Sequence, residues 1–337
     1  MHMYKKLITL ILLGCTALTL LSGCSSKPQE TTQSESTNAP SQVNEIRIGC
    51  MKGPTAIGMI QLLSESDAGN TENTYQYTIA GAADELSAAL IKGDLDIASI
   101  PCNLASVLYN KTEGEILTAA INTLGVLYIV EGSTSIQTVS DLAGKTLYST
   151  GQGTTPEYTL RYLLTCAGLD PDKDVTIEYK AEASEVVATL SQHPDAAAML
   201  PQPFVTAAMN SNPDLRIALD ITKEWEALTQ NTVVTGVIVV RKAFLEQNPE
   251  AFHTFLTEYQ SSAEYANHSI DETAALLEKY DVFKAAIAKK AIPYCNVVFL
   301  TGKEMKEHAT AYLQVLYDQN PSSIGGSLKE EMFYLEE

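Results

Sequence analysis

The chain has 337 residues, of which 45% are hydrophobic and 19% are charged, and its formal net charge is -19 at pH 7. This length is sufficient for two domains that each have a hydrophobic core. A chain this acidic lacks the basic face on which nucleic-acid binding depends, so we expect no nucleic-acid partner.

An apolar run near the N-terminus has the pattern of a secretory signal. Lys5 and Lys6 precede the run from Leu7 to Leu21, which is too short for a stable membrane span. The run ends in LSGC, which is typical of a bacterial lipobox, whose cysteine carries the lipid of the mature protein. We therefore predict a signal peptide over residues 1–23 and a lipid anchor on Cys24. The alternative is an ordinary signal that is cleaved without lipidation.

The segment 24–44 consists mainly of Ser, Thr, Gln, Glu, Asn and Pro. Such a segment cannot bury enough apolar surface to offset the entropy lost on ordering. We predict a flexible tether with a reach of roughly 25 Å. The folded part is then expected at the extracytoplasmic face of the bacterial cell membrane, lipid-anchored and not crossing it.

Two segments one hundred residues apart show the same order of elements. Residues 83–101 read ADELSAALIKGDLDIASIP, and residues 183–201 read ASEVVATLSQHPDAAAMLP. Each pattern predicts a helix, a polar turn and a short apolar strand that ends in proline. Upstream of each, at residues 45–63 and 144–164, a strand runs through a glycine loop into a helix. Such alternation predicts a parallel sheet with helices on both faces in each half.

Two apolar segments mark where the chain passes between these halves. Ala119 to Glu131 is expected to be one long strand, and Val233 to Arg241 a second. Together they would form a two-strand hinge that permits closure around a ligand. The predicted fold class is therefore α/β, with two doubly wound lobes. The alternative is a single large α/β domain.

The lobes are predicted to comprise residues 45–131 plus 236–337 for lobe 1, and residues 132–235 for lobe 2. Helical periodicity over Pro249 to Asn267 and Asp271 to Ala291 predicts two helices that complete lobe 1.

A cleft between two such lobes is the expected ligand site. In open α/β sheets, ligands bind at the carboxyl ends of the strands. The candidate ligand-binding residues are those that follow the predicted strands or lie in the hinge: Lys52, Gly53, Pro54, Thr55, Asn103, Asn122, Thr123, Tyr148, Gly151, Gln152, Gly153, Thr154, Thr155, Gln202, Phe204 and Thr235.

The glycine loop GQGTTP at residues 151–156 could cap a helix and offer backbone N–H groups to an anion or a carbonyl. Thr155 can be the N-cap with Pro156 at the first helical position, or Thr154 can be the N-cap with Glu157 completing a capping box. The loop lacks the lysine of a P-loop, so a nucleotide site is excluded.

The other candidates are assigned by side-chain chemistry. The amides of Asn103 and Gln202 can both donate and accept hydrogen bonds. Phe204 and Tyr148 either stack on a planar ligand or pack in the core. Lys52 either adds a positive charge to the site or is solvated.

Cysteines and histidines give no sign of a metal site, a cofactor or a catalytic group. The chain has no CxxC, HExxH or GxSxG motif. Cys50 and Cys102 both fall at predicted strand ends, where we expect packed thiols. A disulfide between them is the alternative.

Several phrases in their order along the chain resemble the SsuA-like family of ABC-importer solute-binding proteins, which handles alkanesulfonates, taurine, nitrate and thiamine-pyrimidine precursors. The phrases are GPTAIGM, GDLDIASIP, VSDLAGKTLYSTGQGTTPEYTLRYLL, GLDPDKDVTIEY, LPQPFV and VVRKAF, and the resemblance covers about residues 45–320. It implies the type II periplasmic-binding-protein fold and delivery of a small solute to a membrane permease. An enzyme branch of the family, the pyrimidine synthases, has a CCCFC motif and an essential histidine, and neither is present here.

The sequence thus predicts a monomeric, lipid-anchored solute-binding protein that is not an enzyme. Two alternatives are an extracytoplasmic enzyme related to pyrimidine-precursor synthases and a ligand-sensing receptor subunit. The charge of the solute is open. Helix N-termini favour an anion, but no arginine lies at the predicted cleft, so a sulfonate, another anion, a vitamin and a pyrimidine-like heterocycle are all retained.

Overall fold

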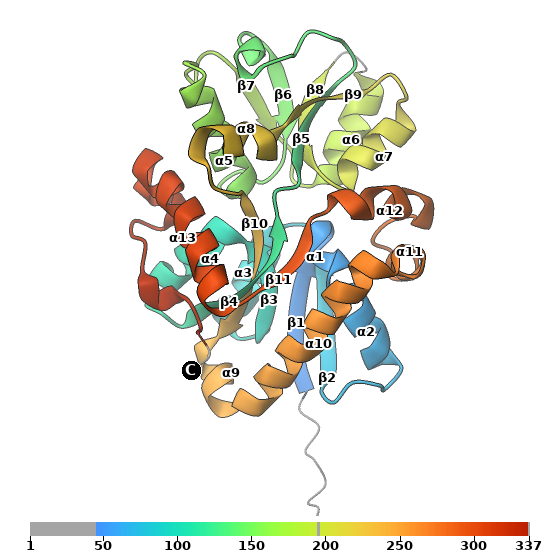
Figure 1. Ribbon diagram of the computed structural model, residues 1–337, viewed down its shortest axis with the longest axis vertical. Coiled ribbons are helices and arrows are strands. Elements are labelled where there is room, and N and C mark those ends of the chain that lie inside the picture. Colours follow the sequence, from blue (N-terminus) through green and yellow to red (C-terminus); the bar gives the residue numbers. More distant parts are fainter. Residues whose placement is uncertain (1–44, 194–195, 336–337) are drawn as a thin grey trace, which may run out of the picture. The chain divides into compact units, whose positions relative to one another are not determined.

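The chain folds into two α/β lobes, each built on one sheet (Figure 1). The computed structural model describes residues 45–193 and 196–335. The predictions for the signal peptide, the tether and Cys24 therefore lie outside the described residues. The separate sheets favour two lobes over the single large α/β domain.

The sheet of the first lobe has the strand order β11-β4-β10-β3-β1-β2. Strands β1, β2 and β3 are parallel, whereas β10 runs antiparallel to β3 and β4, and β11 antiparallel to β4. The strand bounds are Glu45–Met51 (β1), Thr74–Ala80 (β2), Ile97–Pro101 (β3), Ile116–Leu124 (β4), Val234–Arg241 (β10) and Val297–Leu300 (β11).

The sheet of the second lobe repeats this arrangement with the order β7-β6-β8-β5-β9. Strands β6, β7 and β8 are parallel, and β5 runs antiparallel to β8 and β9. The bounds are Leu127–Glu131 (β5), Thr146–Ser149 (β6), Thr176–Tyr179 (β7), Ala197–Pro201 (β8) and Arg216–Asp220 (β9). The predicted parallel pairing is therefore correct for the first three strands of each repeat. The sheets are mixed because the strands that follow each passage between lobes enter in the opposite direction.

Helices cover both sheets. In the first lobe they are Pro54–Ile57 (α1), Ile60–Asp67 (α2), Ala83–Lys92 (α3), Cys102–Lys111 (α4), Lys242–Gln247 (α9), Pro249–His268 (α10), Ile270–Lys279 (α11), Ala285–Ala291 (α12) and Gly302–Gln319 (α13). In the second lobe they are Thr155–Cys166 (α5), Ala183–Gln192 (α6), Phe204–Ser211 (α7) and Ile221–Thr229 (α8). The hundred-residue repeat is confirmed, since α3 and β3 begin one hundred residues before α6 and β8.

Three expected elements are divided in the structure. The strand expected over Ala119 to Glu131 is β4 followed by β5, with β5 in the second sheet. The helix expected after Pro54 is divided into α1 and α2 near Gly58, where an added Cβ would lie 2.6 Å from the Tyr259 hydroxyl. The helix expected over Asp271 to Ala291 is α11 and α12, joined by a loop at residues 280–284.

Sheet membership gives a physical criterion for the lobe limits, which stay a prediction. β5 hydrogen-bonds to β8 and β9, so residues 127–131 are part of the second sheet. β10 hydrogen-bonds only into the first sheet among the described strands. The chain thus passes between the lobes just before β5 and just before β10.

The apolar core continues from one lobe into the other along α13. One cluster of buried side chains includes Ile121 from β4, Leu127 from β5, Leu160 from α5 and Tyr312 from α13. The ring centroids of Tyr312 and of Trp225 on α8 are 5.1 Å apart. The Tyr312 hydroxyl is 2.8 Å from Thr159 Oγ1 on α5. Helix α13 follows the last strand of the first lobe in the chain and packs against both lobes. It therefore fixes the second lobe relative to the first.

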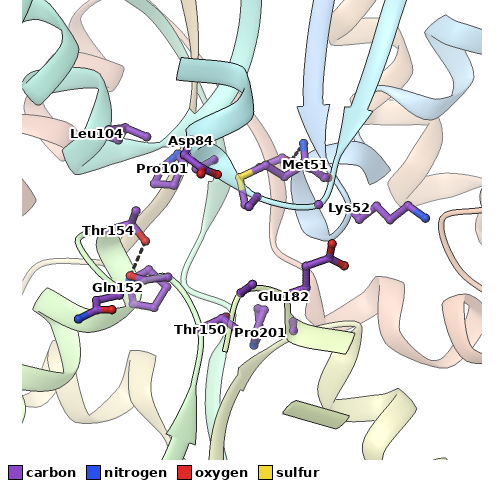
Figure 2. Close-up of a pocket in the computed structure, with 18 of the residues that line it drawn as sticks. Met51, Lys52, Asp84, Pro101, Leu104, Thr150, Gln152, Thr154, Glu182 and Pro201 are labelled. Carbon is purple, nitrogen blue, oxygen red and sulfur yellow. Dashed lines mark hydrogen bonds between the residues drawn. The ribbon is translucent and has the colours of Figure 1, made fainter. Parts of the chain in front are cut away.

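This packing brings the carboxyl ends of both sets of parallel strands face to face. Met51 and Pro101 end β1 and β3, and Thr150 and Pro201 follow or end β6 and β8. Figure 2 shows these four residues around the same space. The fold therefore places the strand-to-helix loops of the two lobes opposite each other.

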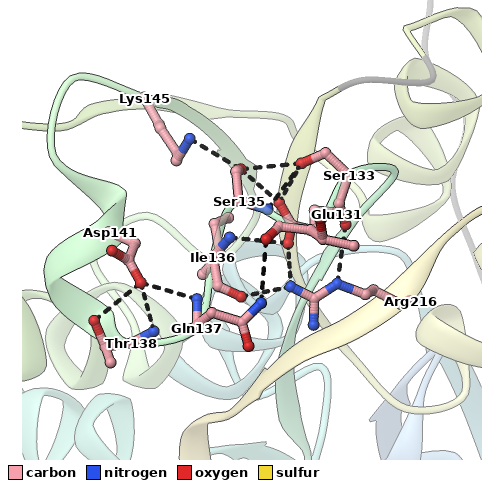
Figure 3. A network of polar contacts seen from close by, with 10 residues as sticks. Glu131, Ser133, Ser135, Ile136, Gln137, Thr138, Asp141, Lys145 and Arg216 are labelled. Atoms are coloured by element: carbon pink, nitrogen blue, oxygen red, sulfur yellow. Dashed lines mark hydrogen bonds and ion pairs between the residues drawn. The ribbon is translucent and has the colours of Figure 1, made fainter.

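A buried carboxylate holds the start of the second lobe together (Figure 3). Glu131 at the end of β5 accepts hydrogen bonds from Ser133 Oγ at 2.6 Å, Ser135 Oγ at 2.9 Å and Ile136 N at 3.0 Å. It also forms an ion pair with Arg216 of β9. Burial alone would raise the pKa of Glu131, but these hydrogen bonds outweigh burial and lower the pKa to about 2.

We predict that Glu131→Gln lowers the free energy of unfolding by about 2 kcal/mol, because it leaves Arg216 and two serines without a buried anion. The pKa is below the usual value of about 4.3, so this stabilisation is complete above that pH and is lost as the pH falls toward 2. Urea unfolding at several pH values measures it. A wild-type-to-variant difference that does not shrink below pH 4 would contradict the assignment.

Candidate functional site

A cavity of about 1010 Å³ lies between the lobes. Its walls are the loops after β1, β2 and β3 of the first lobe and after β6, β7 and β8 of the second. Of the sequence-predicted residues, the structure brings nine together as cavity lining: Lys52, Pro54, Thr55, Gly151, Gln152, Gly153, Thr154, Phe204 and Thr235.

The loop after β1 forms the wall of the first lobe. Thr55 Oγ1 accepts a hydrogen bond from Met51 N and donates one to Met51 O, both at 3.2 Å, which closes the turn over Lys52 and Gly53. Gly53 has φ of +143°, a conformation that favours glycine. A Cβ added to Gly53 would lie 3.8 Å from the ring of Phe204 in the opposite lobe. Gly53 therefore shapes the turn without itself lining the cavity.

The loop after β6 forms the opposing wall. Thr154 is the N-cap residue of α5, but its hydroxyl donates to Gly151 O at 2.7 Å, so the expected side-chain cap is not formed. The Glu157 carboxylate accepts from Gly153 N at 2.6 Å and from Arg161 Nε at 2.7 Å. This is not the predicted capping box, because Glu157 bonds the residue before the N-cap. A carboxylate therefore already satisfies one of the donors that we expected to face the ligand.

Asn103 links the two walls. It is fully buried, and its Nδ2 donates to Ser323 O at 2.9 Å and to Gly153 O at 3.2 Å. Its Oδ1 accepts from Thr155 Oγ1 at 3.3 Å. Asn103 and Thr155 thus lie behind the lining, where they join the first lobe to the glycine loop of the second.

The hinge-strand candidates lie at the floor of the cavity. Thr235 lines it, and Asn122 and Thr123 are buried beneath it. Among the residues that the structure describes, the hydroxyls of Thr123 and Thr235 have no hydrogen-bond partner, whereas the Asn122 amide interacts with the Tyr259 hydroxyl. A Cβ added to Gly236 would lie 2.6 Å from Asn122 Oδ1. A side chain at position 236 would therefore clash with the Asn122 amide, which packs directly behind the cavity floor.

Three further candidates, one of them also a lining residue, lie in the second lobe. Gln202 is buried, and its Oε1 accepts from Thr206 N at 3.2 Å and Thr206 Oγ1 at 2.8 Å, so it caps α7. Phe204 lines the cavity and meets Phe283 of the α11–α12 loop edge to face, with ring centroids 4.9 Å apart. Tyr148 packs in the lobe beneath Lys180 Nζ, which lies 5.2 Å from the ring centroid.

Sequence reasoning missed the loops after β2 and β7. Gly81 in the first loop faces Glu182 in the second, and a Cβ at residue 81 would lie 2.4 Å from the Glu182 carboxylate. Figure 2 shows Glu182 reaching toward the first lobe. These loops precede the repeated helices α3 and α6. The rule that ligands bind at the carboxyl ends of strands would have predicted them if it had also been applied to β2 and β7.

The α11–α12 loop and the cavity-facing sides of α3 and α4 were also missed. Asp281 and Val282 line the cavity. Asp281 adopts φ of +54°, and no glycine or proline marks the break between α11 and α12. The sequence therefore gave no indication that the chain forms a loop here.

The cavity carries charges of both signs. Its lining includes three lysines and three carboxylates, and Lys52 Nζ lies 4.0 Å from Asp281 Oδ2. The described residues contain no group of three or more His, Cys, Asp or Glu side chains arranged for a metal ion. The charged lining residues are Lys52, Lys111, Lys180, Asp84, Glu182 and Asp281.

Cys50 and Cys102 are free thiols, so the disulfide alternative is wrong. Both are buried, but they belong to different core clusters. Burial raises the pKa of Cys50 to about 12 and that of Cys102 further. Both side chains therefore pack as small neutral groups.

Comparison with known proteins identifies the family. The model of a family described as "ABC transporter, phosphonate, periplasmic substrate-binding protein" matches residues 68–290. The chain belongs to this family, which consists of non-catalytic, extracytoplasmic binding proteins. It is the solute-binding component of an ABC importer. No curated protein matches the chain.

Solved structures show the same fold. An ABC transporter protein from Parabacteroides distasonis is 25% identical, with a TM-score of 0.71 over 87% of this chain and 100% of that chain. The periplasmic aliphatic sulphonate binding protein SsuA from Escherichia coli is 18% identical, with a TM-score of 0.67 over 86% and 92%. The periplasmic nitrate-binding protein NrtA from Synechocystis PCC 6803 is 14% identical, with a TM-score of 0.65 over 86% and 84%. The predicted type II periplasmic-binding-protein fold is confirmed.

We predict that Asn103→Ala destabilises the protein by roughly 1–3 kcal/mol, because it leaves Ser323 O buried without its amide donor and removes the hydrogen bond from the Thr155 hydroxyl. Asn70→Ala is the matched control, since exposed Asn70 bonds only Glu65 among the described side chains. Its effect should stay within about 0.5 kcal/mol. Urea unfolding of both variants measures the difference, and equal midpoints would show that Asn103 does not link the lobes.

Proposed function

We propose that the protein is a monomeric, membrane-anchored binding subunit that captures a small organic solute in the interlobe cavity and delivers it to an ABC permease. The observation that carries this proposal is one cavity lined by strand-to-helix loops from both lobes. Such a site closes when the lobes approach each other and opens when they separate.

The size and chemistry of the cavity favour an organic solute. About 1010 Å³ is at the upper end of the range for drug-sized ligands and far exceeds the space that an inorganic oxyanion occupies. Lysines are offset by carboxylates, no arginine lines the cavity among the described residues, and Glu157 already lies at the start of α5. The family description names phosphonate, and a structural relative binds aliphatic sulphonate. These features support a solute with a polar head group and an organic body.

The residues that line the cavity are the proposed ligand contacts. Lys52, Thr55, Gln152 and Thr154 hold the polar group, and Phe204 and Thr235 bound it from the second lobe and the floor. The other predicted residues support these contacts from behind: Gly53, Asn103, Asn122, Thr123, Tyr148, Thr155 and Gln202.

We predict that one class among phosphonates, sulfonates, carboxylates, pyrimidines and vitamins stabilises the purified protein in a thermal-shift screen. A ligand at 100 times its Kd should add about 2.7 kcal/mol. The double variant Lys52→Ala/Gln152→Ala should weaken that ligand at least tenfold. The control Lys303→Ala, whose side chain is 87% exposed, should not. A screen in which no class shifts the melting temperature contradicts the proposal.

The anchor is tested separately. We predict that the wild-type protein expressed in a bacterium partitions into the membrane fraction and that Cys24→Ala releases it. Mass spectrometry of the wild-type N-terminal peptide should show a lipid on Cys24. An unmodified N-terminus with the same partitioning in both proteins would favour the ordinary secretory signal.

A further inference from the structure

The two lobes contact each other at opposite edges of the molecule, and the two contacts differ in their packing (Figure 1). At one edge, α13 joins the lobes through a single buried cluster that includes Tyr312 and Trp225. At the other edge, the α11–α12 loop reaches α7. There the cluster of the first lobe, with Phe283 at its margin, and the cluster of the second lobe, with Phe204 at its margin, are separate. The contact between these two rings joins the two clusters.

The Phe204 ring belongs to the second lobe and packs against two segments of the first. Phe204 begins α7, and its ring meets that of Phe283 edge to face, with the centroids 4.9 Å apart. A Cβ added to Gly53 would lie 3.8 Å from Phe204 Cε2, so the ring also lies close to the turn after β1. Movement of the second lobe away from the α11–α12 loop would therefore separate the two phenylalanine rings.

The loop that carries Phe283 is held in one conformation by its own lobe. Val282 N and Phe283 N both donate to Leu277 O, at 2.9 Å and 3.2 Å. The Val282 side chain is buried in the cluster of the first lobe. The Glu278 carboxylate accepts from Ala285 N at 3.1 Å, at the start of α12. The loop therefore presents Phe283 to the second lobe in a preorganised position, which lowers the entropy lost when the lobes meet.

The Phe204–Phe283 contact lies between two cavities. A second cavity of about 300 Å³ is lined by Phe204 and Val187 of the second lobe and by Phe283 and Ile287 of the first. It adjoins the interlobe cavity, because Phe204 and Val282 line both. The two rings are half-buried, whereas the side chains that join α13 to the second lobe are fully buried. Separation of the lobes at the α11–α12 edge therefore exposes less apolar surface than separation at the α13 edge, and costs less free energy.

We propose that Phe283 is a positioning residue for solute capture, which acts through the Phe204 ring to hold the lobes together at the α11–α12 edge. We call the Phe204–Phe283 contact the latch. The inference rests on the proposed function, since Phe204 lines the solute cavity while Phe283 lines the second cavity. Because the latch consists entirely of protein side chains, it makes the closed form the major one before any solute enters. Loss of such a ring pair lowers the ratio of closed to open protein by roughly twofold to tenfold.

The test measures the closed fraction of the protein without any solute. Single-molecule energy transfer reports the interlobe distance between dyes attached through azide-bearing residues in place of Glu272 on α11 and Ser191 on α6, both exposed. Phe283→Ala should lower the ratio of closed to open molecules roughly twofold to tenfold. Phe204→Ala should also lower it. The double variant should go no further than Phe204→Ala, because both substitutions remove the same contact.

Phe299→Ala is the matched control. Phe299 is half-buried at the margin of the same first-lobe cluster as Phe283, and its ring centroid lies 5.8 Å from that of Tyr259 in the same lobe. This variant should lower the midpoint of urea unfolding and leave the closed fraction unchanged. Phe283→Leu keeps an apolar side chain and should recover part of the closed fraction that Phe283→Ala loses. The fluorescence of Trp225, the single tryptophan, should match wild type in each variant because the α13 contact stays intact.

Three results would overturn the inference. Equal closed fractions in wild type and Phe283→Ala show that Phe283 does not hold the lobes together. An equal loss in Phe299→Ala shows that any weakening of the first lobe opens the cleft. A wild-type protein that is mainly open without solute shows that the latch does not close it. Because these measurements contain no solute, they are separate from the solute screen, whose failure overturns the proposed function and leaves the measured closed fractions standing.

Discussion

The position of the second lobe depends on the packing of α13 against it. Tyr312 on this helix is fully buried between the Trp225 ring and the Thr159 hydroxyl. Burial of an aromatic side chain of this size stabilises by roughly 1.5–3 kcal/mol, and the ring pair adds to that. Because α13 otherwise packs on the first lobe, this contact sets how far apart the two walls of the cavity stand.

Asn103 extends the same constraint to the edge of the site. Its amide joins the backbone of the glycine loop to the segment that follows α13, at Ser323. A change in the distance between the lobes must therefore break or lengthen hydrogen bonds that lie directly behind the ligand loops. In this way the packing of the C-terminal helix and the geometry of the site are coupled through one buried side chain.

The two repeats are alike in backbone and differ in what covers them. In the second lobe Phe283 packs against Phe204 beside a smaller cavity of about 300 Å³, whereas in the first lobe residues of α3 and α4 line the large interlobe cavity. The glycine loops differ too, since Glu157 and Arg161 balance charge at the start of α5, whereas α1 begins beside Lys52 and Asp281. The two lobes therefore present different side chains to the same cavity.

Local pattern was sufficient for much of the fold. The hundred-residue repeat predicted α3, β3, α6 and β8 at their observed positions. These elements are encoded by the spacing of apolar residues and by the prolines at strand ends, which are patterns between residues close together in the sequence. Lys52, Thr55, Gln152 and Thr154 line one cavity, as expected from their positions just after predicted strands.

What only the tertiary structure decided depends on residues far apart in the chain. Gly58 interrupts a helix where Tyr259 approaches, and Glu157 takes the donor that the ligand was expected to use. Asp281 reaches the cavity on a loop that no glycine or proline announces. A single sequence records which residues are neighbours along the chain. The site is made by contacts between residues that are distant in the sequence, such as the hydrogen bond between Asn103 and Ser323, which are 220 residues apart.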